Sequence, residues 1–308
     1  MDEIFNIETV AQLNSMIGSI ETRHPLITVI DFSKVESFDS SAFSKFTANL
    51  YCVVLKGLRK GSLKYGRQNY DFQEGTLVFM SPNQVISVEE DEQEVARQKE
   101  EVDMSWGIFF HPDLIKGTSL NQKMKEYSFF SYGSNEALHL SQKEKLMLTE
   151  TVRKIEIELS ENMDIHSKDL IVSNIELLLN YCVRYYGRQF ITRTNTSKGV
   201  LAKFEAVLTA YFDSDEIQNK GLPTVQYCAD NLHLSSNYLG DLLKKETGKN
   251  ALEHIHYHLI EEAKSKLLST SKTIGEIAFE LGFSYPQYFS KIFKQKTGFS
   301  PGEYRSVN

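Results

Sequence analysis

Short apolar runs, separated by glycine and other turn residues, fill the first third of the chain. They lie at Leu26–Ile30, Tyr51–Leu55, 62–65, Thr76–Met80, 85–88 and Trp106–Phe110. Runs of this length that are rich in β-branched and aromatic residues predict strands, because such side chains fit the pleated surface of a sheet. Several short strands with turn residues between them indicate a sandwich or a barrel.

Helical spacing of the apolar residues follows. One face of a helix predicted over 142–162 carries Leu146, Thr149, Val152, Ile155 and Leu159. A second helix, predicted over 167–186, carries Leu170, Ile171, Asn174, Leu177, Leu178, Tyr181 and Cys182. Two amphipathic helices in tandem expose more apolar surface than one small barrel is able to cover. The excess predicts a partner helix pair, and therefore a homodimer.

A purely polar segment, Thr192–Gly199, comes between these helices and a second region of helical pattern. A segment without apolar residues between two well-patterned regions is typical of an interdomain linker. We therefore predict a β-rich domain at 1–140, a helical hairpin at 141–191, a linker at 192–199 and a helical domain at 200–308.

The end of the chain has the layout of a helix-turn-helix unit. A short helix over 274–281 contains the small residue Ala278, which lets a neighbouring helix approach closely. Gly282 follows, and glycine adopts the left-handed conformation of a tight turn at little cost. Ser284 is predicted to cap the second helix by accepting a hydrogen bond from one of its first amides.

A second copy of this pattern lies about fifty residues upstream, with a first helix and turn over 225–235 and a second helix over 238–248. Such internal repetition indicates a repeated supersecondary unit. A helix predicted over 252–268 joins the two copies. Its apolar face consists of Ile255, Leu259, Ala263 and Leu267.

The lettering of the downstream copy resembles the C-terminal signature of the AraC/XylS family of transcriptional regulators. The residues that carry the resemblance are Gly282-Phe283, Tyr288-Phe289, Phe293-Lys294, Gly298, Pro301 and Tyr304-Arg305. The resemblance implies an α+β chain with an N-terminal cupin-like β-barrel and a helical hairpin that dimerises. It also implies a C-terminal all-α domain whose two helix-turn-helix units bind double-stranded DNA.

In a helix-turn-helix unit, the second helix enters the major groove and its first turns contact base edges. The outward positions predicted for the downstream unit are Pro286, Gln287, Ser290, Lys291 and Lys294. Gln287 is able to pair with adenine, and Lys291 with guanine or a phosphate. By the resemblance, Gln287, Ser290 and Lys291 fall at base-contact positions of the family.

The upstream unit is predicted to read bases less well. Its outward positions are Ser236, Asn237, Gly240, Asp241 and Lys244. Glycine offers no side chain and aspartate repels phosphate, so Asn237 is the best candidate for a base contact, with adenine as its partner. His233 and Leu259 also depart from the glycine and the arginine that many family members have at these positions.

Net charge alone would argue against DNA as a partner, because the formal value is −7. Phosphate binding, however, depends on local basic clusters. Acidic residues concentrate at 89–103, whereas Lys291, Lys294 and Lys296 follow one another without an acid between them. The charge pattern is therefore compatible with DNA binding.

Other chemistry finds little support in the sequence. Cys52, Cys182 and Cys228 lie too far apart for a zinc motif, and we predict reduced, buried thiols. The stretch 57–88 contains no histidine, so no cofactor is expected in the barrel. A metal-dependent cupin-type enzyme fused to a DNA-binding domain remains the alternative function. His254, His256 and His258 are predicted to be polar positions on the joining helix rather than metal ligands.

The sequence thus predicts a sequence-specific DNA-binding transcription regulator rather than an enzyme. It would act as a homodimer, respond to a small-molecule effector through its N-terminal domain, and contact RNA polymerase if it is an activator. A protein-binding adaptor is a third alternative. Trp106 is predicted to belong either to the core or to the wall of an effector pocket. The N-terminus lacks a signal peptide and no apolar run is long enough to cross a membrane, which predicts a cytoplasmic protein.

Overall fold

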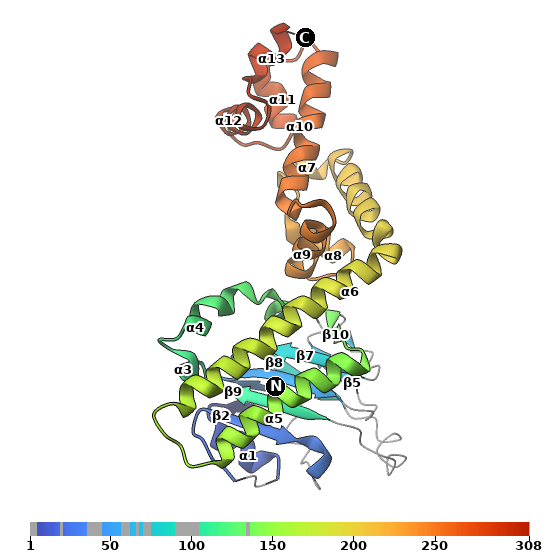
Figure 1. Ribbon diagram of the computed structural model, residues 1–308. Coiled ribbons are helices and arrows are strands. Elements are labelled where there is room, and N and C mark those ends of the chain that lie inside the picture. Colours follow the sequence, from blue (N-terminus) through green and yellow to red (C-terminus); the bar gives the residue numbers. More distant parts are fainter. Residues whose placement is uncertain are drawn as a thin grey trace. The chain divides into compact units, whose positions relative to one another are not determined.

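The computed structural model describes residues 5–18, 21–35, 45–56, 62–65, 68–69, 75–89, 105–133 and 136–307 (Figure 1). The acidic run predicted as a loop at 89–103 lies outside the described residues from position 90 onward. The chain forms two compact units, Met1–Gln189 and Phe190–Asn308. The boundaries predicted at 140, 191 and 199 stay predictions.

Two five-stranded sheets make up the centre of the N-terminal unit. One has the order β1 (Phe5–Ile7), β3 (Lys45–Ala48), β8 (Val85–Glu89), β5 (Ser62–Tyr65) and β6 (Gln68–Asn69). The other has the order β10 (Leu138–His139), β7 (Thr76–Met80), β4 (Tyr51–Lys56), β9 (Trp106–Phe110) and β2 (Ile27–Asp31). All six predicted strands are confirmed.

The second sheet explains why its central strands read as continuous apolar runs. Val53 of β4 lies opposite Phe79 of β7 on one side and opposite Ile108 of β9 on the other. Every residue of β7 and β9 is buried, so both faces of these strands are covered. The α+β class is confirmed. In the described part of the chain no strand pairing joins the two sheets, and the cupin-like barrel stays a prediction.

Short helices and the core complete this arrangement. Helix α1 (Val10–Met16) begins with a capping box between Thr9 and Gln12 and buries Val10 and Leu13 against the sheets. The 3₁₀ turns and short helices of the unit are η1 (Phe32–Lys34), α3 (Pro112–Ile115), α4 (Ser119–Lys123), η3 (Met124–Glu126) and η4 (Ser128–Ser131).

The three cysteines are free and buried, as predicted. Burial raises the pKa of Cys52 to about 12, so this thiol stays protonated and unreactive. Trp106 is buried, and its Nε1 donates a hydrogen bond to Thr149 Oγ1 at 3.0 Å. Of the two alternatives for Trp106, the core position is therefore the one observed.

Helices α5 (Gln142–Ser160) and α6 (Ser167–Phe212) form the predicted hairpin, but α6 differs from prediction in length. It was expected to end at Tyr186 and to be followed by a linker at 192–199. The helix instead continues through that segment. The segment is polar but contains no proline, and its glycine is the last residue. Polarity without a helix breaker does not end a helix.

The apolar face predicted for the hairpin is also only partly buried. Leu170 and Leu177 are exposed, whereas the buried stripe on α6 includes Ile171, Val172, Ile175, Leu178, Leu179 and Cys182. Leu146 of α5 is exposed in the same way. The buried stripe on α6 is therefore turned away from Leu170 and Leu177 toward Val172 and Leu179, because neighbouring positions on a helix diverge by about 100°.

The C-terminal unit is helical beyond the end of α6. Its elements are α7 (Glu216–Lys220), α8 (Val225–Asn231), α9 (Ser236–Thr247), α10 (Ala251–Ser269), α11 (Ile274–Glu280), α12 (Pro286–Thr297) and α13 (Pro301–Val307). Both predicted helix-turn-helix units and the joining helix α10 are therefore present. None of the helices in the described residues is long and apolar enough to span a membrane.

Two apolar cores lie in this unit, and α10 contributes to both. Ile255 belongs to the core around α8 and α9, whereas Leu259, Ala263 and Leu267 belong to the core around α11 and α12. All four predicted apolar positions of α10 are thus confirmed as buried. Leu259, which stands where many family members have an arginine, is one of these core residues.

The joining helix also packs against the end of α6 through two of its histidines. The ring of His254 contacts that of Phe204 at 5.9 Å between centroids, and the ring of His258 contacts that of Phe212 at 4.9 Å. His254 Nε2 lies 2.8 Å from Thr247 Oγ1. These histidines therefore have packing partners, and no group of three or more possible metal ligands occurs in the part of the chain that the structure describes.

Candidate nucleic-acid interface

The turn of the downstream helix-turn-helix unit depends on Gly282. Its φ of +79° lies in the left-handed region, as predicted. The Gly282 amide donates to the Phe279 carbonyl and the Phe283 amide to the Ala278 carbonyl, both at 3.0 Å. A Cβ atom at this position would lie 2.6 Å from the carbonyl oxygen of Ile217 in α7. Backbone conformation and close packing therefore both require glycine here.

The upstream turn makes the same bonds with a histidine. His233 adopts a φ of +57°, and its amide donates to the Asp230 carbonyl at 3.1 Å. The Leu234 amide donates to the Ala229 carbonyl at 2.9 Å. A non-glycine residue pays about 1–2 kcal/mol for this conformation. His233 therefore adopts the left-handed conformation that glycine has at the equivalent position of the downstream turn.

The two copies differ by one residue in the turn. Ala229 and Ala278 are equivalent and 49 positions apart (278 − 229), whereas the glycines that end the second helices, Gly248 and Gly298, are 50 apart (298 − 248). The downstream turn is therefore one residue longer.

The extra residue changes how the second helix begins. Upstream, the Ser235 side chain caps α9 by accepting from the Tyr238 amide at 3.2 Å. Downstream, the N-cap of α12 is Tyr285, without a side-chain cap, and Pro286 occupies the first helical position. The prediction that Ser284 caps this helix was therefore wrong. Proline needs no capping partner there, because it has no amide hydrogen and its φ suits the helix.

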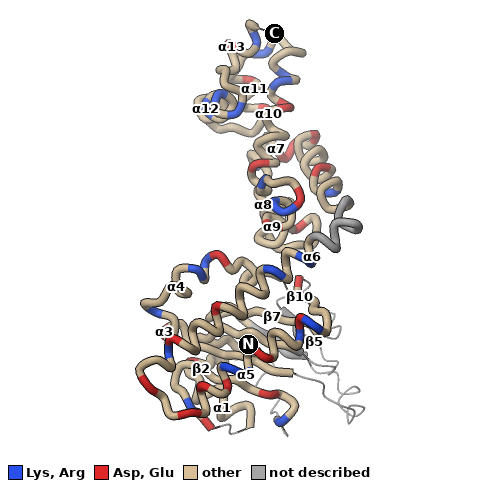
Figure 2. Tube along the Cα trace, in the orientation of Figure 1, with Lys and Arg blue, Asp and Glu red and all other residues tan. Residues whose placement is uncertain are grey.

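Helix α12 presents a polar and basic face. Gln287, Lys291 and Lys294 are exposed, whereas Pro286 and Ser290 are half-buried. Phe289 and Phe293 are completely buried and fix the orientation of the helix. The helix contains three lysines and no acidic residue, and Figure 2 shows this concentration of positive charge along α12. The structure thus brings the predicted downstream residues onto one helix, and three of them are exposed.

Helix α9 presents a weaker face. Asn237 and Lys244 are exposed, whereas Ser236, Gly240 and Asp241 are half-buried. The Ser236 hydroxyl donates to Gln226 Oε1 of α8 at 2.7 Å. Two lysines and two acids on α9 give no net charge, in contrast to α12. Because phosphate attracts positive charge, α9 offers DNA less electrostatic attraction than α12, and the expectation that the upstream unit reads bases less well stays a prediction.

Two exposed tyrosines at the start of α12 were missed in the sequence. Tyr285 and Tyr288 are each 63% exposed, although the second belongs to the Tyr-Phe pair of the family signature. One signal was available: Phe289 points inward, and its neighbour on a helix points about 100° away from it. The accessible face of α12 therefore extends toward Tyr288.

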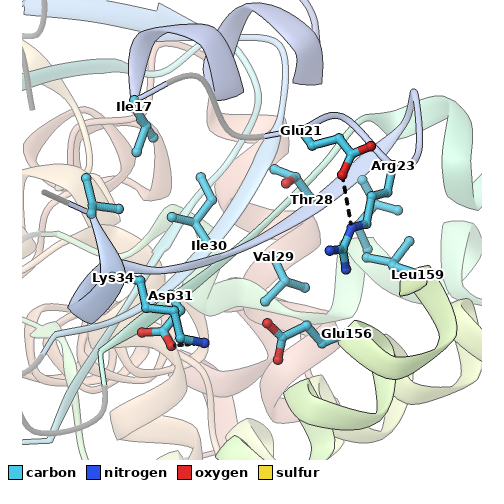
Figure 3. Close-up of a pocket in the computed structure, with 13 residues that line it drawn as sticks. Ile17, Glu21, Arg23, Thr28, Val29, Ile30, Asp31, Lys34, Glu156 and Leu159 are labelled. Atoms are coloured by element: carbon cyan, nitrogen blue, oxygen red, sulfur yellow. Dashed lines mark ion pairs between the residues drawn. The ribbon is translucent and has the colours of Figure 1, made fainter. Parts of the chain in front are cut away.

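The N-terminal unit contains a separate pocket of about 490 Å³ between α1, β2 and α5 (Figure 3). Ile17, Val29 and Leu159 supply apolar lining, and Glu156 faces it from α5. Lys34 pairs with Asp31 at 3.0 Å, and this hydrogen bond and charge raise the pKa of Lys34. Glu21 and Arg23 also line the pocket, so five of its lining residues are charged, and a pocket of this size and polarity suits a small polar molecule.

Comparison with known proteins agrees with the C-terminal geometry. Residues 228–306 match the family profile described as a helix-turn-helix domain. The transcriptional regulatory protein YesN of Bacillus subtilis (strain 168) is 35% identical over 94 residues, which are 30% of this chain and 26% of YesN. The xylose operon regulatory protein of Escherichia coli (strain K12) is 36% identical over 84 residues, which are 27% of this chain and 21% of that protein.

Among solved structures, the C-terminal domain of AraT, a response regulator from Geobacillus stearothermophilus, is 30% identical, with a TM-score of 0.31. The match covers 35% of this chain and 84% of that domain. The chain spans about a quarter of the length of the two curated relatives named above.

The C-terminal unit therefore contains a helix-turn-helix domain of the AraC/XylS type, built from two helix-turn-helix units and similar to the corresponding part of these transcription regulators. The residue pattern of its last helices had indicated this type of domain.

Proposed function

We propose that the whole chain is a sequence-specific transcription regulator that reads DNA chiefly through α12. The observation that carries this proposal is the contrast between the two second helices. Helix α12 combines exposed Gln287, Lys291 and Lys294 with three lysines and no acid, whereas α9 has no net charge. Glutamine pairs with adenine and lysine with guanine or phosphate, so α12 holds the groups that both specific and non-specific binding need.

Homodimerisation through the α5–α6 hairpin belongs to this proposal. Leu170, Leu177 and Val183 of α6 are exposed large apolar residues, and the partner copy would cover them. A dimer would carry four helix-turn-helix units. It would work in the cytoplasm, and as an activator it would contact RNA polymerase.

The N-terminal unit would act as the sensor. We propose that its two sheets form a cupin-like fold and that a small polar effector enters the pocket lined by Val29, Glu156 and Leu159. An effector that binds one arrangement of the dimer better than another shifts the population toward it. The relatives named above are regulators, and the alternative of a metal-dependent enzyme is not supported.

In vitro selection from a random duplex library tests the proposal directly. The full-length chain should enrich a defined sequence and bind it at least about 10³-fold more tightly than a scrambled duplex. Equal affinity for selected and scrambled duplexes would contradict sequence-specific regulation. If a variant that is monomeric in solution bound the selected duplex as tightly as the wild type, the proposed dimeric assembly on DNA would be contradicted.

A further inference from the structure

Tyr285 and Tyr288 form an exposed aromatic pair at the end of α12 that is expected to enter the major groove. Their rings meet edge to face at 6.1 Å between centroids and 68° between planes. Gln287 lies between them in the chain and is itself exposed. Two large rings in contact with each other and open to solvent leave apolar surface that a partner is able to cover.

The upstream copy shows what a tyrosine at the same position does when it is structural. Tyr238 and Tyr288 are 50 residues apart and therefore equivalent (288 − 238). Tyr238 is 2% exposed, and its ring packs on Phe190 of α6 at 5.2 Å and 65°. Tyr288 is 63% exposed, although the residues that anchor α12, Phe289 and Phe293, are fully buried.

We infer that Tyr285 and Tyr288 read thymine in the DNA, next to the base that Gln287 reads. Thymine is the only base with a 5-methyl group in the major groove, and apolar side-chain surface is what recognises it. An A·T pair presents that methyl group together with the adenine N6 and N7 atoms that suit glutamine. The three side chains would therefore select consecutive A·T pairs. This inference rests on the proposed function, since it assumes that α12 enters the groove.

The test uses the full-length protein and a duplex selected in vitro from a random library. Each thymine of that duplex is replaced in turn by deoxyuridine, which lacks only the 5-methyl group. Loss of one buried methyl group is worth about 0.8 kcal/mol, or about four-fold in affinity. We expect one or two thymine positions at which the replacement weakens wild-type binding by about that factor.

Variants then assign the contact to the tyrosines. At those positions, replacing thymine with deoxyuridine should not weaken DNA binding by the Tyr285→Ala or Tyr288→Ala variant. It should still weaken binding by Tyr288→Phe, because this variant retains the ring. Tyr257→Ala is the matched control, since Tyr257 is similarly exposed but lies on α10. It should respond to deoxyuridine as the wild type does.

Several results would overturn the inference. Wild-type protein that is insensitive to deoxyuridine at every thymine would do so without any variant. Equal sensitivity of the wild type and both alanine variants would exclude the tyrosines as the readers. If affinity for the selected duplex fell in Gln287→Ala but not in either tyrosine variant, this inference would fail while the proposed function would stand. If selection enriched no sequence, the proposed function would fail with it.

Discussion

At the scale of single residues, Gly282 is required for two separate reasons, and the chain provides a control that separates them. Gly298 has a similar φ of +83°, but an added Cβ would meet nothing within 4 Å. We expect Gly298→Ala to lower the free energy of unfolding by about 1–2 kcal/mol through backbone strain alone. Gly282→Ala should cost a further 1–3 kcal/mol, roughly, because its Cβ would meet the Ile217 carbonyl. Urea unfolding of both variants measures the difference, and equal costs would contradict the crowding.

The exposed polar residues of α12 should divide into base-reading and phosphate-binding roles. Gln287→Ala should weaken binding to the selected duplex by about ten-fold or more, and leave binding to a scrambled duplex nearly unchanged. Lys294→Ala should weaken binding to both and lower the salt slope by about one unit. Titrations at two salt concentrations measure both quantities. Equal loss on both duplexes for Gln287→Ala would exclude a base contact.

Asp241 provides the matched test in the upstream unit. It occupies the position in α9 that Lys291 occupies in α12, 50 residues later (291 − 241). Asp241→Ala should leave specific binding unchanged and tighten non-specific binding, because it removes a negative charge from a helix that faces phosphate. The same titrations apply. A large specific loss would show that Asp241 accepts a hydrogen bond from a base.

Sequence reasoning correctly predicted the inward side of α12, because Gly282 sets the turn and Phe289 and Phe293 are buried. The DNA contacts of the outward residues stay predictions. The same reasoning did not predict that the side chains of Tyr285 and Tyr288 are exposed. Whether a tyrosine at this position is buried depends on what packs over it, and Phe190, which covers Tyr238, lies almost fifty residues away in the chain. Local pattern carries no information about that contact.

At the scale of elements, the exposed stripe of α6 decides how the homodimer should be tested. Leu177 is 41% exposed, whereas Leu178 is completely buried within one copy. Leu177→Glu should therefore yield a folded monomer with weaker DNA binding. Leu178→Glu should lower the free energy of unfolding by about 3–5 kcal/mol, since it buries an unpaired charge. Sedimentation and thermal melting distinguish these results, and a Leu177→Glu variant that remains dimeric would rule out this face.

Helix α10 should make the C-terminal unit sensitive to mild acid. Burial lowers the pKa of both His254 and His256 below the ordinary value of 6.5. The folded state then binds fewer protons than the unfolded chain, so stability is full above pH 6.5 and falls below it. Thermal melts at several pH values between about 7 and about 5 should show this loss of stability. This pH range lies above the ordinary pKa values of carboxylates, so their protonation contributes little. Substituting both histidines with glutamine should flatten the profile, and an unchanged profile would contradict their role.

The sequence predicted six of the described strands and most helix boundaries correctly, because apolar runs and helical spacing are local properties of the chain, but it missed β1, β3, β6 and β10. It failed where the deciding factor lies elsewhere. The segment 192–199 contains no apolar residue and no proline, so its sequence is compatible with both a linker and a helix, and the structure shows the helix. Leu170 and Leu177 were grouped with Ile171 and Leu178 on one apolar face, because helical spacing alone does not show which side of that face is buried within one copy.

At the scale of the whole molecule, the division into Met1–Gln189 and Phe190–Asn308 predicts that the second unit is able to fold by itself. It has two apolar cores of its own, joined by α10. A fragment covering 190–308 should give a cooperative thermal transition and bind the selected duplex. Its affinity should fall below that of the full chain, since it lacks the hairpin and with it the avidity of a dimer. Equal affinity would show that the N-terminal unit adds nothing to assembly on DNA.

The extra residue in the downstream turn has a consequence for the engineering of chimeric regulators. Helices α9 and α12 are each 12 residues long and end at equivalent glycines, so one could be transplanted in place of the other without a gap. If the exchanged segments instead began after His233 and Gly282, the upstream unit would gain one residue in its turn, and the downstream unit would lose one. The turn before the transplanted helix would then be one residue longer or shorter than the recipient's own turn. The usable splice point for modular exchange is therefore the first residue of each helix.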